Sequence, residues 1–213
     1  MHDPSGEADG SRRLGPPPGA SADAGRVLAV TVVWLLAACL VGASDRFAAL
    51  RPPAPQVVLA GVTVLLWAAT RCWAPLRRFV ETVDPRWLVL FHLTRFVGFY
   101  FLALHARGEL PWAFAVPGGW GDIVVAASGL LLVLAARPDT PGGRRAYLVW
   151  NVAGLADILG VVVTAARLTF RDPRSMRALL QLPLSLLLTF VVPIIIVTHI
   201  VMLRRLGRAA TRT

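Results

Sequence analysis

Hydrophobic residues in this sequence fall into six long blocks separated by short polar segments. Roughly 20 helical residues cross a hydrocarbon layer about 30 Å thick, and each block is close to that length. Inside lipid every backbone amide needs an internal partner, which an α-helix provides. A transmembrane β-barrel would show alternating segments of about 10 residues, and none is present. The predicted spans are residues 27–43, 56–74, 86–106, 120–136, 146–167 and 178–203.

The pattern therefore predicts an all-α, polytopic membrane protein, a six-transmembrane-helix bundle with short loops. The composition agrees, because 56% of the residues are hydrophobic, only 16% are charged, and the mean hydropathy is +0.63. We expect three parts in the chain: a disordered cytoplasmic tail over residues 1–25, a transmembrane domain over 26–206 and a short cytoplasmic tail over 207–213.

The first hydrophobic block has a second interpretation. The small residues at 41–43 resemble a cleavage site, so that block also fits a secretory signal peptide. A signal peptide, however, has a positively charged start and an apolar region of roughly 7–15 residues. Here four acidic residues precede the block, which is also longer than that. The sequence favours a retained first helix, with the cleaved form as the alternative.

All 22 basic residues of the chain are arginines, and its formal net charge is +10. In a soluble domain such a balance would point to a nucleic-acid partner. Here the arginines lie almost wholly between the apolar blocks, and an excess of them marks the cytoplasmic side of a membrane protein. Fourteen lie in segments on the side of the N-terminus and seven on the opposite side. Both termini are therefore predicted to be cytoplasmic, with no nucleic-acid partner, although four of the seven cluster at 167–177.

Charged residues within the spans are the clearest candidates for function, because each costs about 2.5–3.5 kcal/mol on insertion scales. Arg95 and Asp157 lie at similar depth in the third and fifth spans, since a helix rises about 1.5 Å per residue. We expect an ion pair between them. It serves either to set helix packing or as a substrate or proton site, unless Arg95 extends to the membrane surface instead.

Histidines in the third and sixth spans raise the possibility of a haem. His92 and His199 are predicted at the same level, where two axial ligands could hold an iron. A single pair without repeated histidine spacing is weak support, so haem is disfavoured and no cofactor or metal is predicted. Cys39 and Cys72 lie within apolar blocks and are interpreted as buried, apolar residues.

The segment between the third and fourth blocks, 108-GELPWAFAVPGGWGD-122, is unusually rich in aromatic residues, glycine and proline. Its tryptophans suit the level of the lipid headgroups, and its glycines and prolines suit turns. We therefore predict an interfacial or shallow re-entrant segment that forms an outer lid. Asp122 is predicted to cap the fourth helix at its start, or else to face Arg95 or His105 from the outside.

Three stretches resemble a group of uncharacterised bacterial multi-span membrane proteins, over roughly residues 86–165. The stretches are RxxGxxF from Arg95 to Phe101, GELPxxFAxPxGxGD from Gly108 to Asp122 and WNxxGLxD from Trp150 to Asp157. The resemblance implies a bacterial inner membrane protein in which Arg95, Asp122, Asn151 and Asp157 belong to one pattern. It implies no activity.

Function follows from the intramembrane charges more than from any motif. No P-loop, HExxH or GxSxG pattern is present. The best interpretation is permeation or transport of a small solute, proton or ion in the lipid bilayer, for which six helices favour a homo-oligomer. A scaffold with a purely structural ion pair is one alternative. A membrane enzyme or redox protein using Glu109, Asp122 and His105 is the other. The predicted binding residues are Arg95, Asp157, Asp122, His92, Asn151 and Glu109.

Overall fold

The computed structural model of the chain describes residues 20–210, and no β-strand occurs within them. Six helical stretches in this part are long and apolar enough to cross a membrane, as the sequence predicts. They are Ala22–Gly42, Ala54–Cys72, Pro85–Ala106, Trp112–Ala135, Pro141–Arg171 and Leu187–Arg208. The chain is therefore an all-α, six-span membrane protein.

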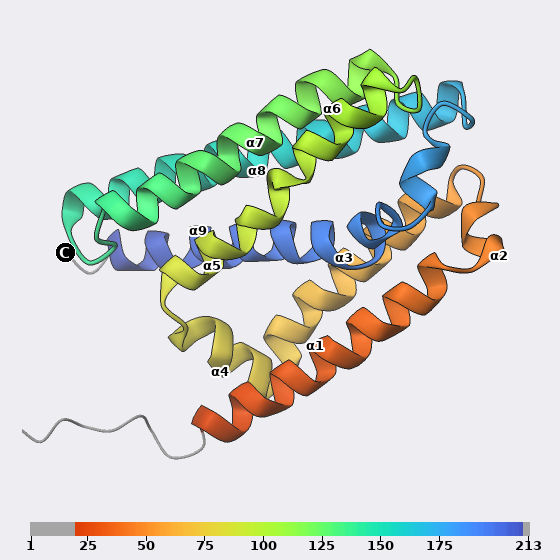
Figure 1. Ribbon diagram of the computed structural model, residues 1–213. Coiled ribbons are helices and arrows are strands. Elements are labelled where there is room, and N and C mark those ends of the chain that lie inside the picture. The colour runs from red at the N-terminus through yellow and green to blue at the C-terminus, as the bar shows by residue number, and fades with distance from the viewer. Residues whose placement is uncertain (1–19, 211–213) are drawn as a thin grey trace, which may run out of the picture.

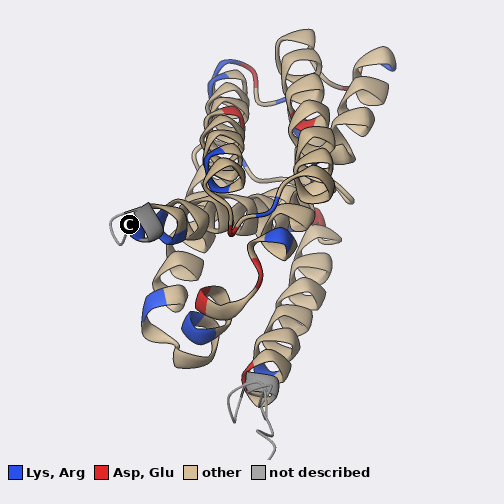
Figure 2. Cartoon of the chain, turned by 90° about the vertical axis from the view of Figure 1, so that its left-hand side faces the viewer, with Lys and Arg blue, Asp and Glu red and all other residues tan. Residues whose placement is uncertain are grey.

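The helices run back and forth between two ends of the molecule (Figure 1). One end carries α4 (Ala74–Thr82), the turn between α7 (Trp112–Ala135) and α8 (Pro141–Arg171), and the close of α9 (Val192–Ala210). We call it the α4 end. The opposite end carries α2 (Asp45–Ala48), and we call it the α2 end. Figure 2 shows that charged residues gather near helix ends and turns, while most helix middles are uncharged.

The tails predicted at 1–25 and 207–213 fall partly outside the described residues. Residues 1–19 and 211–213 are not described. Where the chain is described, α1 (Ala20–Gly42) already begins within the first of these segments, and α9 continues to Ala210 in the second.

Helix α9 lies at the centre of the fold (Figure 1). It packs against α8 on one side and against α3 (Ala54–Cys72) on the other. Helix α7 joins α8 to the third span, and α1 packs against α4. The arrangement places α7, α8 and the third span in one group, and α1 and α3 in another, with α9 between them.

Helix α4 was not predicted as a separate element, and it lies between the second and third spans. Arg78 binds Asp23 of α1 through two hydrogen bonds, and this bonding raises the pKa of the arginine. Arg205 of α9 donates to the carbonyl oxygens of Val80 and Val83, which lie at the end of α4 and have no helical donor. Arginine side chains thus hold this short helix against α1 and against the central helix α9.

The last span begins later than the predicted residue 178. Residues 178–184 form part of a short 3₁₀ helix, η2 (Arg177–Leu180), and turns around Pro183. Helical structure resumes at residue 185, and a π-helical turn, η3 (Leu187–Val191), leads into α9. Pro193 has no N–H to donate to the preceding turn. The indole of Trp34 in α1 donates to the carbonyl of Thr189, four residues earlier, at 3.0 Å. The neighbouring helix thus supplies a donor where the proline provides none.

The third span and α7 approach one another most closely at Gly98 and Gly119. A Cβ atom at Gly98 would collide with the carbonyl oxygen of Gly119, and it would lie 3.1 Å from Cβ of Asp122. Backbone against backbone leaves no flexible side chain to move aside. Small residues permit this approach in membranes.

Gly98→Ala is therefore expected to lower the free energy of unfolding by about 1–3 kcal/mol, the usual range for overpacking. Thermal unfolding of the detergent-solubilised protein measures the effect. Gly160→Ala is the matched control, because a Cβ atom at Gly160 in α8 would meet nothing within 4 Å. Equal melting temperatures for the two variants would contradict the close packing described at Gly98.

Candidate functional site

Arg95 lies where the third span departs from α-helical geometry. The span consists of α5 (Pro85–Phe91), a 3₁₀ segment η1 (His92–Val97) and α6 (Gly98–Ala106). Arg95 lies within η1, and only 1% of its side chain is exposed. A 3₁₀ stretch in the middle of a helix often marks a hinge or a strained segment. The most deeply buried charge of the described chain therefore lies at a break in helical geometry.

The Arg95 guanidinium binds three groups from two other spans. Its Nε donates to Oδ1 of Asp122 in α7 at 2.7 Å, and one terminal nitrogen donates to Oδ2 of Asp157 in α8. The other terminal nitrogen donates to the carbonyl oxygen of Gly154 at 3.0 Å. The predicted pair with Asp157 is thus present, and Arg95 does not extend to the surface. We call Arg95, Asp122 and Asp157 the Arg95 centre.

The predicted lid over residues 108–122 is wrong, and so is the capping role of Asp122. Helix α7 begins at Trp112 and contains Pro117, so Asp122 lies ten residues inside it. Gly118 and Gly119 are buried there rather than forming turns. The glycines suggested a loop in the sequence, but their small size serves close packing between helices. Asp122 faces Arg95 from within the membrane-spanning part.

The two carboxylates of the Arg95 centre differ in exposure. The side chain of Asp122 is 4% exposed and that of Asp157 is 26% exposed. Gly121 lies directly against Asp157, because a Cβ atom there would collide with its carboxylate. One guanidinium therefore faces two carboxylates, one buried and one partly exposed.

A second polar cluster lies beside the Arg95 centre, toward the α4 end, and we call it the histidine cluster. His92 binds Thr198 through Nε2 at 3.1 Å, and His199 binds Oδ1 of Asn151 through Nδ1 at 2.8 Å. Asn151 also donates to the backbone carbonyl of His199. The side chains of His92, His199 and Asn151 are fully buried. The two predicted groups of polar residues, on the third and fifth spans, thus meet through α9.

The histidine rings contact each other directly. Their centroids lie 4.3 Å apart, and His92 also packs edge-to-face with Trp150. Two nitrogens on opposite sides of one metal ion are themselves about 4 Å apart, with the ring centroids further away. The rings as they lie leave no space for a haem between them. Among the described residues there is also no group of three or more candidate metal ligands.

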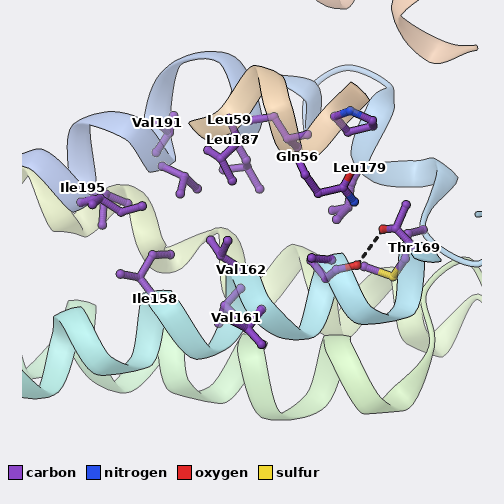
Figure 3. Close-up of a pocket in the computed structure, with 18 of the residues that line it drawn as sticks. Gln56, Leu59, Ile158, Val161, Val162, Thr169, Leu179, Leu187, Val191 and Ile195 are labelled. Carbon is purple, nitrogen blue, oxygen red and sulfur yellow. Dashed lines mark hydrogen bonds between the residues drawn. The ribbon is translucent and has the colours of Figure 1, made fainter. Parts of the chain in front are cut away.

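A cavity of about 470 Å³ leads to the Arg95 centre from the half of the molecule nearer the α2 end. Figure 3 shows Ile158 and Val162 of α8 on one side of it, with Leu187 and Val191 of η3 and Leu59 of α3 on the other. Among the described residues that line it, Arg95 and Asp122 alone carry charge. Gln56 contributes a buried side-chain oxygen that has no hydrogen-bond partner in the described part of the chain.

The cavity opens sideways between α3 and α8. Val64 of α3 and Leu159 and Val163 of α8 belong to its lining, and all three side chains are exposed. An apolar cavity of this size with few polar groups is typical of small-molecule sites. The cavity is therefore apolar over most of its lining and charged where it meets Arg95 and Asp122.

Comparison with known families assigns the chain to one of them. The model of a family described as a domain of unknown function, DUF8737, matches residues 52–207. The chain belongs to this family. The matched segment contains the last five spans, and with them the Arg95 centre and the histidine cluster. No curated protein and no solved structure matches the chain.

Glu109 is a predicted site residue that the fold of this chain does not bring to the Arg95 centre. It forms an exposed ion pair with Arg107 at 2.9 Å, in the turn between α6 and α7. His105 faces the backbone carbonyl of Leu110 through Nδ1 at 3.0 Å. Asp122 is engaged with Arg95. These three residues of the predicted outer acid–base cluster therefore have separate partners.

Proposed function

We propose that this protein exchanges protons for a small lipophilic cation across the membrane. The observation that carries the proposal is the apolar cavity that ends at Arg95 and Asp122, the guanidinium and the buried carboxylate of the Arg95 centre. Asp157, the second carboxylate of the centre, is bound to the same guanidinium. The apolar part suits the body of the solute, and the carboxylates suit its charge.

The charge balance of the Arg95 centre supports a cation. With both carboxylates ionised, Arg95 leaves one negative charge without a counterion. A net charge at membrane depth is unfavourable, by about 2.5–3.5 kcal/mol on insertion scales. A proton on one carboxylate removes the excess charge, and so does a cationic solute beside it. Because either one suffices, the two compete for the same place, and such competition couples their movement in opposite directions.

The cavity supports a solute that is apolar apart from its charge. It has the volume of a typical small-molecule site, about 300–1,000 Å³, and its lateral opening faces the hydrocarbon layer. The unpaired oxygen of Gln56 supplies an acceptor for an N–H group of the solute. The proposed substrate class is therefore a small aromatic or alkyl amine or ammonium ion.

Purified protein in liposomes tests the proposal with ethidium and tetraphenylphosphonium as probes. An imposed pH gradient is expected to drive accumulation of at least one probe on the acidic side, well above the rate in protein-free liposomes. Absence of pH-driven flux for both cations would overturn the proposal.

Ala166→Trp adds a large side chain to the cavity lining and is expected to slow that flux by about 10-fold or more, equivalent to about 1.4 kcal/mol in a rate barrier. Val152→Trp is the matched control, since Val152 is an exposed residue of the same helix that does not line the cavity. Equal flux in the two variants would show that the solute does not use the cavity.

A structural role for the centre is the second candidate, and the burial of Arg95 favours it. The guanidinium is almost fully buried and connects η1 to α7 and α8 in one contact set. A residue that only fixes the packing of three helices would have this geometry. In that case, replacing all three charged groups together would leave any cellular phenotype of the protein unchanged.

A further inference from the structure

The histidine cluster contains two ring nitrogens whose state follows from their neighbours' hydrogen bonds. Asn151 donates through its amide nitrogen to the backbone carbonyl of His199, so its side-chain oxygen faces the His199 ring. An amide oxygen only accepts, so Nδ1 of His199 carries the hydrogen. In a neutral ring Nε2 is then a bare acceptor, and it is buried without a partner among the described residues.

His92 also has one donating nitrogen and one bare acceptor nitrogen, but a different contact determines which is which. The hydroxyl of Thr198 donates its single hydrogen to the carbonyl of Ile195, so it accepts from Nε2 of His92. This leaves Nδ1 of His92 as a bare acceptor, again buried and without a partner in the described chain. Two lone pairs thus lie in one buried cluster whose rings are 4.3 Å apart. Buried acceptors of this kind are normally paired.

The cluster lies on a polar line between the Arg95 centre and the α4 end. Gly154 links the two groups, because its carbonyl accepts from Arg95 and a Cβ atom on it would come within 2.8 Å of the His199 ring. One helical turn further toward the α4 end from Asn151, Tyr147 presents a buried hydroxyl without a partner among the described residues. The Nε of Arg86, at the start of α5, is likewise buried without a hydrogen-bond partner among the described residues.

We propose that His92 and His199 together bind one proton and pass it between the Arg95 centre and the α4 end. This inference rests on the proposed exchange of protons for a cation. The proton adds to the bare nitrogen of one ring and no bond to carbon changes. A second proton is disfavoured by repulsion between two charged rings in contact.

The charged and titratable groups around the pair make its proton responsive to the centre. Arg95 opposes the proton from η1, whereas Asp122 of α7 and Asp157 of α8 favour it. Tyr147 of α8 and Arg86 of α5 lie on the side of the α4 end. A bare Arg95 centre has an excess negative charge and attracts a proton to the histidines. A cation bound there cancels that attraction and releases the proton.

Two transport measurements distinguish this inference from the proposed function on which it rests. One is pH-driven accumulation of ethidium, and the other is ethidium exchange at equal pH on both sides. His92→Gln and His199→Gln retain an N–H donor for Thr198 and Asn151. Each is expected to reduce pH-driven accumulation of ethidium by about 10-fold or more while leaving ethidium exchange at equal pH within about 2-fold of wild type. His105→Gln is the matched control, with both modes unchanged, since His105 lies in α6 outside the cluster.

Each outcome bears on one proposal. pH-driven accumulation at the wild-type rate in both cluster variants would overturn the histidine relay and leave the proposed function in place. A wild type without flux in either mode would overturn the function itself. Should the variants fail to fold, ¹⁵N NMR of the histidine-labelled wild type decides. It is expected to show Nε2–H at His92, Nδ1–H at His199 and protonation of one ring on acidification. Rings that stay neutral throughout the active pH range would overturn the relay.

Discussion

Arg95→Met is expected to produce a protein that does not reach a stable folded state in the membrane. The substitution removes the only cation that faces Asp122 and Asp157 in the described structure and leaves both carboxylates without their charged partner. Breaking a buried ion pair by removing one partner costs about 3–5 kcal/mol, and total stabilities are about 5–15 kcal/mol. Yield in the membrane fraction and thermal unfolding in detergent measure the loss.

Arg107→Met is the matched control for this experiment. Arg107 also binds a carboxylate, that of Glu109, but both side chains are about half exposed. Exposed pairs of this kind contribute about 0–1 kcal/mol, so the melting temperature is expected to stay close to that of the wild type. An Arg95→Met protein as stable as Arg107→Met would contradict the ion-pair geometry.

The triple variant Arg95→Met, Asp122→Asn, Asp157→Asn separates structure from function. It has no unpaired charge in the membrane-spanning part of the centre, so folding is expected to recover at least partly. If the centre binds protons and cations, the recovered protein carries neither probe. A recovered protein that still transports ethidium would assign the centre a purely structural role.

The spans could be predicted from the sequence because their cause is local. A block of apolar residues long enough to cross lipid must be helical, whatever its neighbours are, and the predicted third span 86–106 differs from Pro85–Ala106 by one residue. The fourth span was predicted to start at residue 120, whereas it begins at Trp112. Glycine and proline favour turns in isolation, yet here Gly98 and Gly119 allow two helices to touch. Whether a glycine forms a turn or allows close helix packing depends on a partner helix, and a local sequence pattern does not show that partner.

The candidate site was partly predictable for the same reason. Arg95 and Asp157 could be paired from depth alone, because both lie on predicted helices that run in the same direction. Asp122 was predicted to face Arg95 only as the alternative to capping, and from the outside, because its helix was thought to begin beside it. Neither the role of the Gly154 carbonyl nor the cavity between α3 and α8 could be predicted from a sequence pattern. They arise from how separate spans are placed around α9.

Asp157→Asn tests the excess negative charge itself. The amide oxygen of the new side chain can still accept from Arg95, and the centre then has one positive and one negative group. Removing a partly exposed charge from membrane depth is expected to leave the melting temperature equal to or above that of the wild type. The neutral centre no longer needs a proton or a cation, so pH-driven ethidium flux is expected to fall about 100-fold, equivalent to about 2.7 kcal/mol in a rate barrier.

Asp139→Asn supplies the comparison for that experiment, because Asp139 lies in the exposed turn between α7 and α8 and forms an ion pair with Arg137 at 3.4 Å. Flux and stability are both expected to match the wild type. A scaffold role for the centre predicts a different result for Asp157→Asn, since an intact hydrogen bond from Arg95 to the substituted side chain would preserve the packing and the phenotype together. A stable Asp157→Asn protein with unchanged flux would therefore show that the excess negative charge is not needed for transport. A stable protein without flux would identify that charge as the feature that binds the solute and the proton in turn.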